Sequence, residues 1–297
     1  MQRSKNAIAL LITVMFVIVI TVAIGISLKQ INLATQEVKD ETFMYQSSII
    51  IEDVLKILHD SPELKAVTDS NSSLDLYTFL AEAAYIPFNS SGIEIVLEVK
   101  SARGKFNPKQ LNAVRADRLR EYLSYKSINS EYVNLLLDSV SGVKIDNSYN
   151  SALFDTHPSL FRDFIASKEH LEVINDFYTK EYNDNALKNV DFDTLFYYGD
   201  TNTTIDVNYA SAELWELMTG VNKERAETLF AGGGSYENDE ALGLSETELS
   251  RLKEFNYTFH EPYLFVNIAI LRDNSRAKIT FEYDVKKNKG SNFVYDI

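Results

Sequence analysis

The segment AIALLITVMFVIVITVAIGISL, residues 7–28, decides how the rest of the chain can be organised. It contains no charged residue, and it has the length that a helix needs to cross a bilayer, which is about 20 residues. A secretory signal peptide has a shorter apolar region with a small-residue cleavage site, so the length favours a membrane-spanning helix. Arg3 and Lys5 precede the segment, and this basic flank predicts a cytoplasmic N-terminus and an exported body.

The helix is expected to continue beyond the membrane. No Pro or Gly occurs after Lys29 until Ser61-Pro62, which should end the helix. The apolar positions at helical spacing are Ile31, Ala34, Val38, Tyr45, Ile49, Leu55 and Leu58. We therefore predict one rod of about 80 Å, with residues 8–28 in the membrane and residues 29–60 outside it. The polar stretch 67–73 predicts a loop.

The bulk composition is that of a folded protein. The chain has 297 residues, 45% hydrophobic and 24% charged, enough for one large domain or two smaller ones. Its net charge of −14 opposes long-range attraction to nucleic acid or anionic lipid headgroups. It has no Cys, which excludes disulfides, thiolate metal sites and Cys nucleophiles.

Strand patterns flank a helical middle. Alternating apolar residues predict a half-buried strand at 93–100 and a C-terminal hairpin, and a more buried strand is expected at 263–271. The hairpin strands are 277–285 and 293–297, joined by a turn rich in Lys, Asn and Gly. The segments expected to be helical are 113–125, 131–139, 158–165 and 169–178.

These patterns predict an α+β fold. A long N-terminal helix would pack on a small antiparallel sheet, and a large all-α domain would be inserted between two strands. Residues 61–106 and 261–297 would form the α/β domain, and residues 107–260 the inserted helical domain. An insertion is tolerated where its two ends lie close together.

Part of the insert, residues 205–230, has the pattern of a helix-hairpin-helix, as found in domains similar to the SAM fold. Ser211 and Asn222 are the expected N-caps of its two helices, and Gly220 is expected to end the first. Residues 232–234 are three glycines and predict a loose turn, after which Ser245 and Glu248 form a capping box for a third helix.

Such hairpins often grip phosphates through backbone N–H groups at a Gly-x-Gly turn, but Gly220-Val221-Asn222 lacks the second Gly. The basic residues Lys223 and Arg225 are also outnumbered by glutamates in the two helices. A structural packing unit is therefore favoured over DNA binding.

No motif for catalysis is present. The four His residues are far apart in sequence, and no nucleophile elbow, P-loop or zinc-protease motif occurs, so an enzyme is not expected. Acidic and Asn oxygens cluster between residues 183 and 202, and they allow either a calcium site or a solvated acidic loop. The candidate calcium ligands are Asp184, Asp191, Asp193 and Asp200.

The whole chain resembles the K-type minor pseudopilins of type II secretion systems. The resemblance rests on three places: the N-terminus Lys5-Asn6-Ala7-Ile8, the stretch 104–108, and the run 204–214 before the helix-hairpin-helix. The order of strand, helical insert and strand also agrees. The resemblance implies a pilin-like α/β domain, and calcium is bound by some members of the family.

The resemblance further implies how the chain is processed and assembled. Residues 1–7 would be a prepilin leader, cut by prepilin peptidase between Ala7 and Ile8, with methylation of the new Ile8 amine. Ala7 stands where a Gly is usual. Most pilins have Glu as the fifth mature residue, whereas this chain has Ile12 there. K-type pseudopilins share this absence and are tip subunits, and a buried carboxylate without a partner is costly.

The expected protein is thus a minor pseudopilin at the tip of a type II secretion pseudopilus, which initiates or caps filament assembly. It would be a single-pass inner-membrane protein with a periplasmic body. Its expected partners are other minor pseudopilins, the major pseudopilin, the inner-membrane assembly platform and prepilin peptidase. Two alternatives stay open: a minor pilin of a type IV pilus or DNA-uptake filament, and a membrane-anchored helix-hairpin-helix protein that binds DNA.

Overall fold

The computed structural model describes residues 45, 47–70, 72–90, 93–200, 202–272 and 275–296. Among these residues, no helix is both long and apolar enough to cross a membrane. The expected transmembrane segment, residues 8–28, lies outside the described residues, as do residues 1–7 and 29–44.

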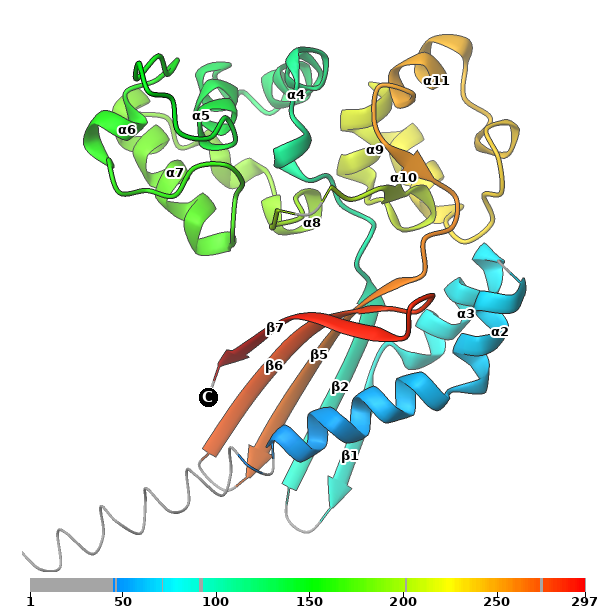
Figure 1. Ribbon diagram of the computed structural model, residues 1–297. Coiled ribbons are helices and arrows are strands. Elements are labelled where there is room, and N and C mark those ends of the chain that lie inside the picture. The colour runs from blue at the N-terminus through cyan, green and yellow to red at the C-terminus, as the bar shows by residue number, and fades with distance from the viewer. Residues whose placement is uncertain are drawn as a thin grey trace, which may run out of the picture.

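A five-stranded antiparallel sheet forms one half of the molecule, with the strand order β1-β2-β5-β6-β7 (Figure 1). Its strands are β1 (Ile86–Ser90), β2 (Ile93–Ser101), β5 (Tyr263–Arg272), β6 (Ser275–Asp284) and β7 (Lys289–Asp296). The predictions of β2, β5 and the β6–β7 hairpin are confirmed. β1 escaped prediction because Pro87 interrupts its pattern, and Pro is tolerated there because β1 is an edge strand.

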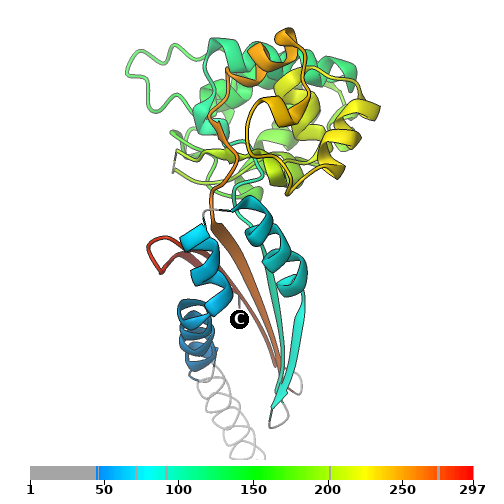
Figure 2. The same cartoon turned by 90° about the vertical axis from the view of Figure 1, so that its right-hand side faces the viewer.

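Three helical segments lie against this sheet (Figures 1 and 2): residues 47–60, α2 (Pro62–Ser70) and α3 (Ser73–Ala83). Their apolar residues share one core with the strands. From residues 47–60, Ile51, Val54 and Leu58 join this core, and their spacing of three and four residues places them on one side of a helix.

α2 corrects the prediction of a loop at residues 67–73, because the helix extends to Ser70. Pro62 does end the preceding helix, but it also begins the next, since Pro is well suited to a first helical turn. The Ser61 hydroxyl accepts a hydrogen bond from the Leu64 N–H at 3.2 Å. Leu64 and Val67 are buried, so tertiary packing holds a segment whose local sequence is polar.

The chain between β2 and β5 forms the helical insert, which stands on one end of the sheet (Figure 1). Its helices are α4 (Ala113–Tyr125), α5 (Glu131–Ser139), α6 (Leu153–Thr156), α7 (Lys168–Tyr182), α8 (Phe192–Leu195), α9 (Ala212–Thr219), α10 (Lys223–Ala231) and α11 (Glu246–Leu252). A short parallel pair, β3 (Ile205–Asp206) with β4 (Tyr257–Thr258), joins the chain before α9 to the chain after α11. The insert has its own hydrophobic core, centred on residues such as Trp215 and Leu119. The molecule is therefore α+β with two cores.

Two expectations for the insert are wrong. Residues 158–165 are not helical: Asp163 has a φ of 134°, and its N–H donates to the Ser139 carbonyl at the end of α5, so a tertiary contact overrides the local pattern. The turn at residues 232–234 is not loose. A Cβ on Gly233 would lie 2.5 Å from the Asn208 carbonyl oxygen, and one on Gly234 would lie 2.4 Å from the Tyr77 ring.

Candidate functional site

The two segments singled out within the body of the chain, 104–108 and 204–214, lie side by side at the junction between sheet and insert. The Asp206 N–H donates to the Arg103 carbonyl at 2.8 Å. A Cβ on Gly104 would lie 2.3 Å from the Tyr209 carbonyl oxygen, so only glycine allows this approach. The junction is therefore built from the stretches that carry the family resemblance.

Asp206 is a fully buried carboxylate at this junction. Its two oxygens accept hydrogen bonds from the backbone N–H groups of Asn208 (3.1 Å) and Glu261 (2.8 Å). Removal from water outweighs these hydrogen bonds and raises the pKa of Asp206 to about 6. The side chain thus joins the chain entering α9 to the chain returning to β5.

Asn208 binds the glycine turn at residues 232–234 to the junction between the sheet and the insert. Its amide N–H groups donate to the carbonyls of Tyr236 (2.9 Å) and Phe259 (2.7 Å), and its oxygen accepts from the N–H groups of Gly234 (2.9 Å) and Tyr236 (3.0 Å). The Phe259 carbonyl also accepts from the Ser73 hydroxyl of α3. One buried amide therefore serves three segments of the insert and connects them with the helix layer on the sheet.

An ion pair that sequence analysis missed lies between the sheet and the insert. Arg103, at the end of β2, pairs with Glu282 of β6 at 3.5 Å, and both side chains are buried. The guanidinium stacks over the Tyr263 ring, 3.7 Å from its centroid, with the Tyr197 ring of the insert 5.5 Å away. The only signal in the sequence was an arginine between Ala102 and Gly104.

The helix-hairpin-helix has the caps that the sequence predicts. The Ser211 hydroxyl accepts from the Leu214 N–H, and the Asn222 side chain accepts from the Arg225 N–H. Gly220 ends α9 with a φ of 72°, and the Ser245–Glu248 capping box of α11 is present.

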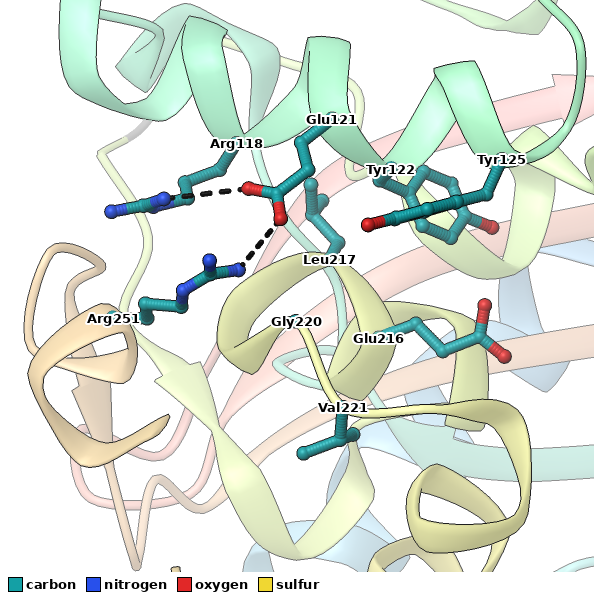
Figure 3. Close-up of a pocket in the computed structure, with 9 residues that line it drawn as sticks. All are labelled: Arg118, Glu121, Tyr122, Tyr125, Glu216, Leu217, Gly220, Val221 and Arg251. Atoms are coloured by element: carbon teal, nitrogen blue, oxygen red, sulfur yellow. Dashed lines mark hydrogen bonds and ion pairs between the residues drawn. The ribbon is translucent and has the colours of Figure 1, made fainter. Parts of the chain in front are cut away.

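The cavity at the hairpin turn offers a phosphate little room, and the two guanidinium groups that line it are already paired. The cavity beside Gly220 has a volume of about 30 Å³, which is about that of one water molecule (Figure 3). Arg251 covers Gly220, and its guanidinium donates to Glu121 at 3.0 Å. Arg118 also contacts Glu121, at 3.4 Å, and pairs with Glu254 at 2.7 Å. Both guanidinium groups at this cavity are therefore paired with carboxylates, whereas Arg225 of α10 donates to the backbone carbonyls of Leu242 and Gly243.

The four candidate calcium ligands are used in separate local structures. Asp184 accepts from the Tyr178 hydroxyl and the Ala186 N–H, Asp191 caps α8, and Asp193 pairs with Lys168. Asp200 lies with Asp193 along a groove described below. Within the described ranges, no group of three or more His, Asp or Glu residues is arranged to hold a metal ion. Calcium binding stays a prediction.

The predicted processing residues Ala7 and Ile8, and the assembly position Ile12, lie outside the described residues. The described end of the long helix carries a different feature. Tyr45, Ile49 and Ile57 are large apolar residues that are exposed to solvent, at spacings of four and eight residues. They lie outside the core formed by Ile51, Val54 and Leu58, so this helix leaves three large apolar side chains in contact with water, among charged neighbours such as Lys56.

Comparisons with known proteins identify the fold. No protein family model matches the chain, and no curated protein matches it in sequence. Among solved structures, the chain is similar to the GspK-GspI-GspJ complex from the type 2 secretion system of enterotoxigenic Escherichia coli, with a TM-score of 0.55 and 11% identity. The match covers 87% of this chain and 99% of the matched chain of that complex. The chain therefore has a GspK-like fold.

Proposed function

We propose that this protein is a minor pseudopilin of a type II secretion system and occupies the tip of the pseudopilus. The observation that carries the proposal is the position of the helical insert. It stands on the end of the sheet opposite to the end from which the helix of residues 47–60, dark blue in Figure 1, enters. A subunit that packs into a filament through its N-terminal helix would carry the insert at the far end, where it would obstruct a further subunit.

The exposed apolar side chains of the helix at residues 47–60 and of Tyr45 before it support the same role. Tyr45, Ile49 and Ile57 would be covered by the helices of neighbouring subunits, which would remove exposed apolar area from water. The partners would be other minor pseudopilins, as in the solved complex with GspI and GspJ, and then the major pseudopilin, the assembly platform and prepilin peptidase. Before assembly, residues 8–28 would anchor the chain in the inner membrane with its body in the periplasm, in a pilin-like arrangement.

The decisive experiment is mass spectrometry of the N-terminus of the protein from its native cells. We expect a mature chain that begins at a methylated Ile8, and an Ala7→Gly variant processed in the same way. Intact Met1 in cells with active prepilin peptidase would sink the proposal. Deletion of the gene should stop protein secretion; loss of twitching or DNA uptake instead would identify a type IV pilus subunit.

A further inference from the structure

A groove of about 680 Å³ lies between the outer face of the sheet and the helical insert. Phe265 of β5, Thr280 of β6 and residues 292–294 of β7 form its floor, and Phe164 and residues 196–200 of the insert form its wall. Phe265 and Thr280 alternate with the core residues Val266 and Ile279, so the floor is the face of the sheet opposite to the helix layer. In Figure 1, the part of the insert around α7 and α8 stands above β6 and β7.

β7 brings an open sheet edge to this groove. It is the last strand of the sheet and, in the part of the chain that the structure describes, pairs only with β6. An irregularity in the β6–β7 register, with Asn292 at a φ of 55°, sits in the groove. Beyond it, residues 293–295 are uncharged, and Val294 is 61% exposed. Unpaired backbone groups beside exposed apolar side chains are a template for another strand.

Lysines and carboxylates both line the groove, Asp193 and Asp200 among the latter, and Lys105 is the lysine that is left for an acidic partner. Lys105 is half-buried there and forms no ion pair with any described residue, although Lys100 pairs with Glu98 and Lys168 pairs with Asp193. Burial lowers the pKa of Lys105, since its ammonium group is partly removed from water. The buried carboxylate of Glu282, on the floor of the groove, forms an ion pair with Arg103.

The turn that leads into β7 extends this basic character. Lys286 and Lys289 are exposed, and neither forms an ion pair with another described residue, on a chain whose net charge is −14. An extended segment lying along β7 would therefore meet ammonium groups at the turn and at Lys105, with apolar side chains between them.

We propose that the groove and the free edge of β7 bind an extended, acidic segment of a neighbouring minor pseudopilin, which adds to β7 as a further strand. Its backbone would pair with β7, its apolar side chains would cover Val294 and Tyr295, and one carboxylate would reach Lys105. Strand addition supplies hydrogen bonds that depend little on sequence, and the charges select the partner. The identity of the partner rests on the proposed function.

The test is a site-specific crosslink in the full-length chain, purified together with its partner minor pseudopilins. Because the chain has no Cys, Val294→Cys places a single benzophenone label at the groove. Val143→Cys, on an exposed loop of the insert, is the matched control. Upon irradiation, we expect the label at position 294 to join an extended segment of a partner subunit that contains Asp or Glu, and the control to give no such adduct.

Binding is measured in parallel with unlabelled variants. Lys105→Gln and Val294→Lys should each weaken co-purification of the partner about tenfold, because one removes the buried cation and the other places a charge on the edge strand. Val294→Thr should bind as the wild type. Circular dichroism checks that every variant is folded, as expected for exposed or half-buried positions.

Each remaining outcome overturns the proposal. An adduct with a second copy of this chain, or with an exported protein, would assign the groove to another occupant. If the partners co-purify but no adduct forms and the variants bind normally, the groove inference fails while the proposed function stands. If no minor pseudopilin co-purifies with the wild type, the proposed function fails and this inference fails with it.

Discussion

At Asp206, a carboxylate is held out of water by the residues that join the insert to the sheet. Its pKa of about 6 in the folded protein lies above the ordinary value of 3.8, so the folded state binds a proton more tightly than the unfolded state. Its contribution to stability therefore increases as the pH falls from about 7 towards about 4.

We expect the wild type to gain up to about 3 kcal/mol over this range relative to Asp206→Asn, which cannot titrate. Urea unfolding of both proteins at several pH values measures the difference, in which the other titrating groups cancel. A difference that is independent of pH would show that Asp206 is solvated.

Asn208 gives a second expectation at this scale. Asn208→Ala removes four hydrogen bonds, three of them buried, and leaves backbone groups of Tyr236 and Gly234 without these partners, while the Phe259 carbonyl keeps the Ser73 hydroxyl. We expect a loss of about 2–4 kcal/mol in the free energy of unfolding. Asn189→Ala is the control, because Asn189 is exposed and makes one long hydrogen bond of 3.5 Å. Equal losses for the two variants would contradict the role of Asn208.

Residue-scale prediction succeeded where the chemistry was local. The caps Ser211, Asn222 and Ser245 bond to N–H groups three residues away, so neighbouring sequence was sufficient to find them. The pair of Arg103 and Glu282 could not be found in this way, because its members come together only after β2 and β6 have joined one sheet. The candidate calcium ligands are close in sequence, and three of them, Asp184, Asp191 and Asp193, are engaged in local contacts of the folded chain, while calcium binding itself stays a prediction.

Among the elements, the glycine turn after α10 forms a contact with α3. Gly234 has a φ of 87°, and a Cβ there would lie 2.4 Å from the Tyr77 ring. Gly142 has a similar φ of 73° but no atom within 4 Å of such a Cβ. An alanine at Gly142 would therefore meet backbone strain alone, whereas an alanine at Gly234 would meet both backbone strain and the Tyr77 ring.

Gly142→Ala should cost about 1 kcal/mol in unfolding free energy, and Gly234→Ala roughly 2 kcal/mol more. The excess should shrink when Gly234→Ala is combined with Tyr77→Ala, because the obstructing ring is then absent. Thermal unfolding of Gly142→Ala, Gly234→Ala, Tyr77→Ala and the Gly234→Ala/Tyr77→Ala double variant completes the comparison. Equal costs for the two glycines would mean that the turn does not press on α3.

Helices and strands were predicted correctly where the spacing of apolar residues within the element was regular. The strands β2 and β6 alternate clearly, β5 is an almost continuous apolar run, and α4 and α5 have the bounds expected from their spacing. α2 and β1 were missed because each carries a Pro and depends on burial against the rest of the sheet domain. The expected helix at 158–165 was lost to a contact between Asp163 and α5.

In the whole molecule, the chain passes between the two cores through one pair of neighbouring strands. Ser101 of β2 is paired directly with Leu264 of β5, so the insert leaves and returns through neighbouring strands. The sequence order predicted an insertion, since strand patterns lie on both sides of a helical middle. The angle and surface between the two parts depend on side chains such as Asn208 and were not predictable.

This connection allows the insert to be removed cleanly. Replacing residues 102–263 with Asn-Gly should close β2 and β5 into a hairpin and leave a folded sheet domain with its own core. We expect cooperative unfolding at a lower temperature, because the contacts with α3 are lost. In secreting cells, electron microscopy should show longer pseudopili, since the tip would no longer be obstructed. Normal filament length with a folded shortened chain would argue against the capping role.

The neighbouring attachment of β2 and β5 also has a mechanical consequence. A load that presses on the insert enters the sheet through two adjacent strands, which are paired from Glu94 to Ser101 along β2. Compression is shared between them along their length, and the stacked Arg103 and Tyr263 sit at the point where the force is transmitted. The link between the insert and the sheet is therefore a ladder of two hydrogen-bonded strands, so a load on the insert is divided between them.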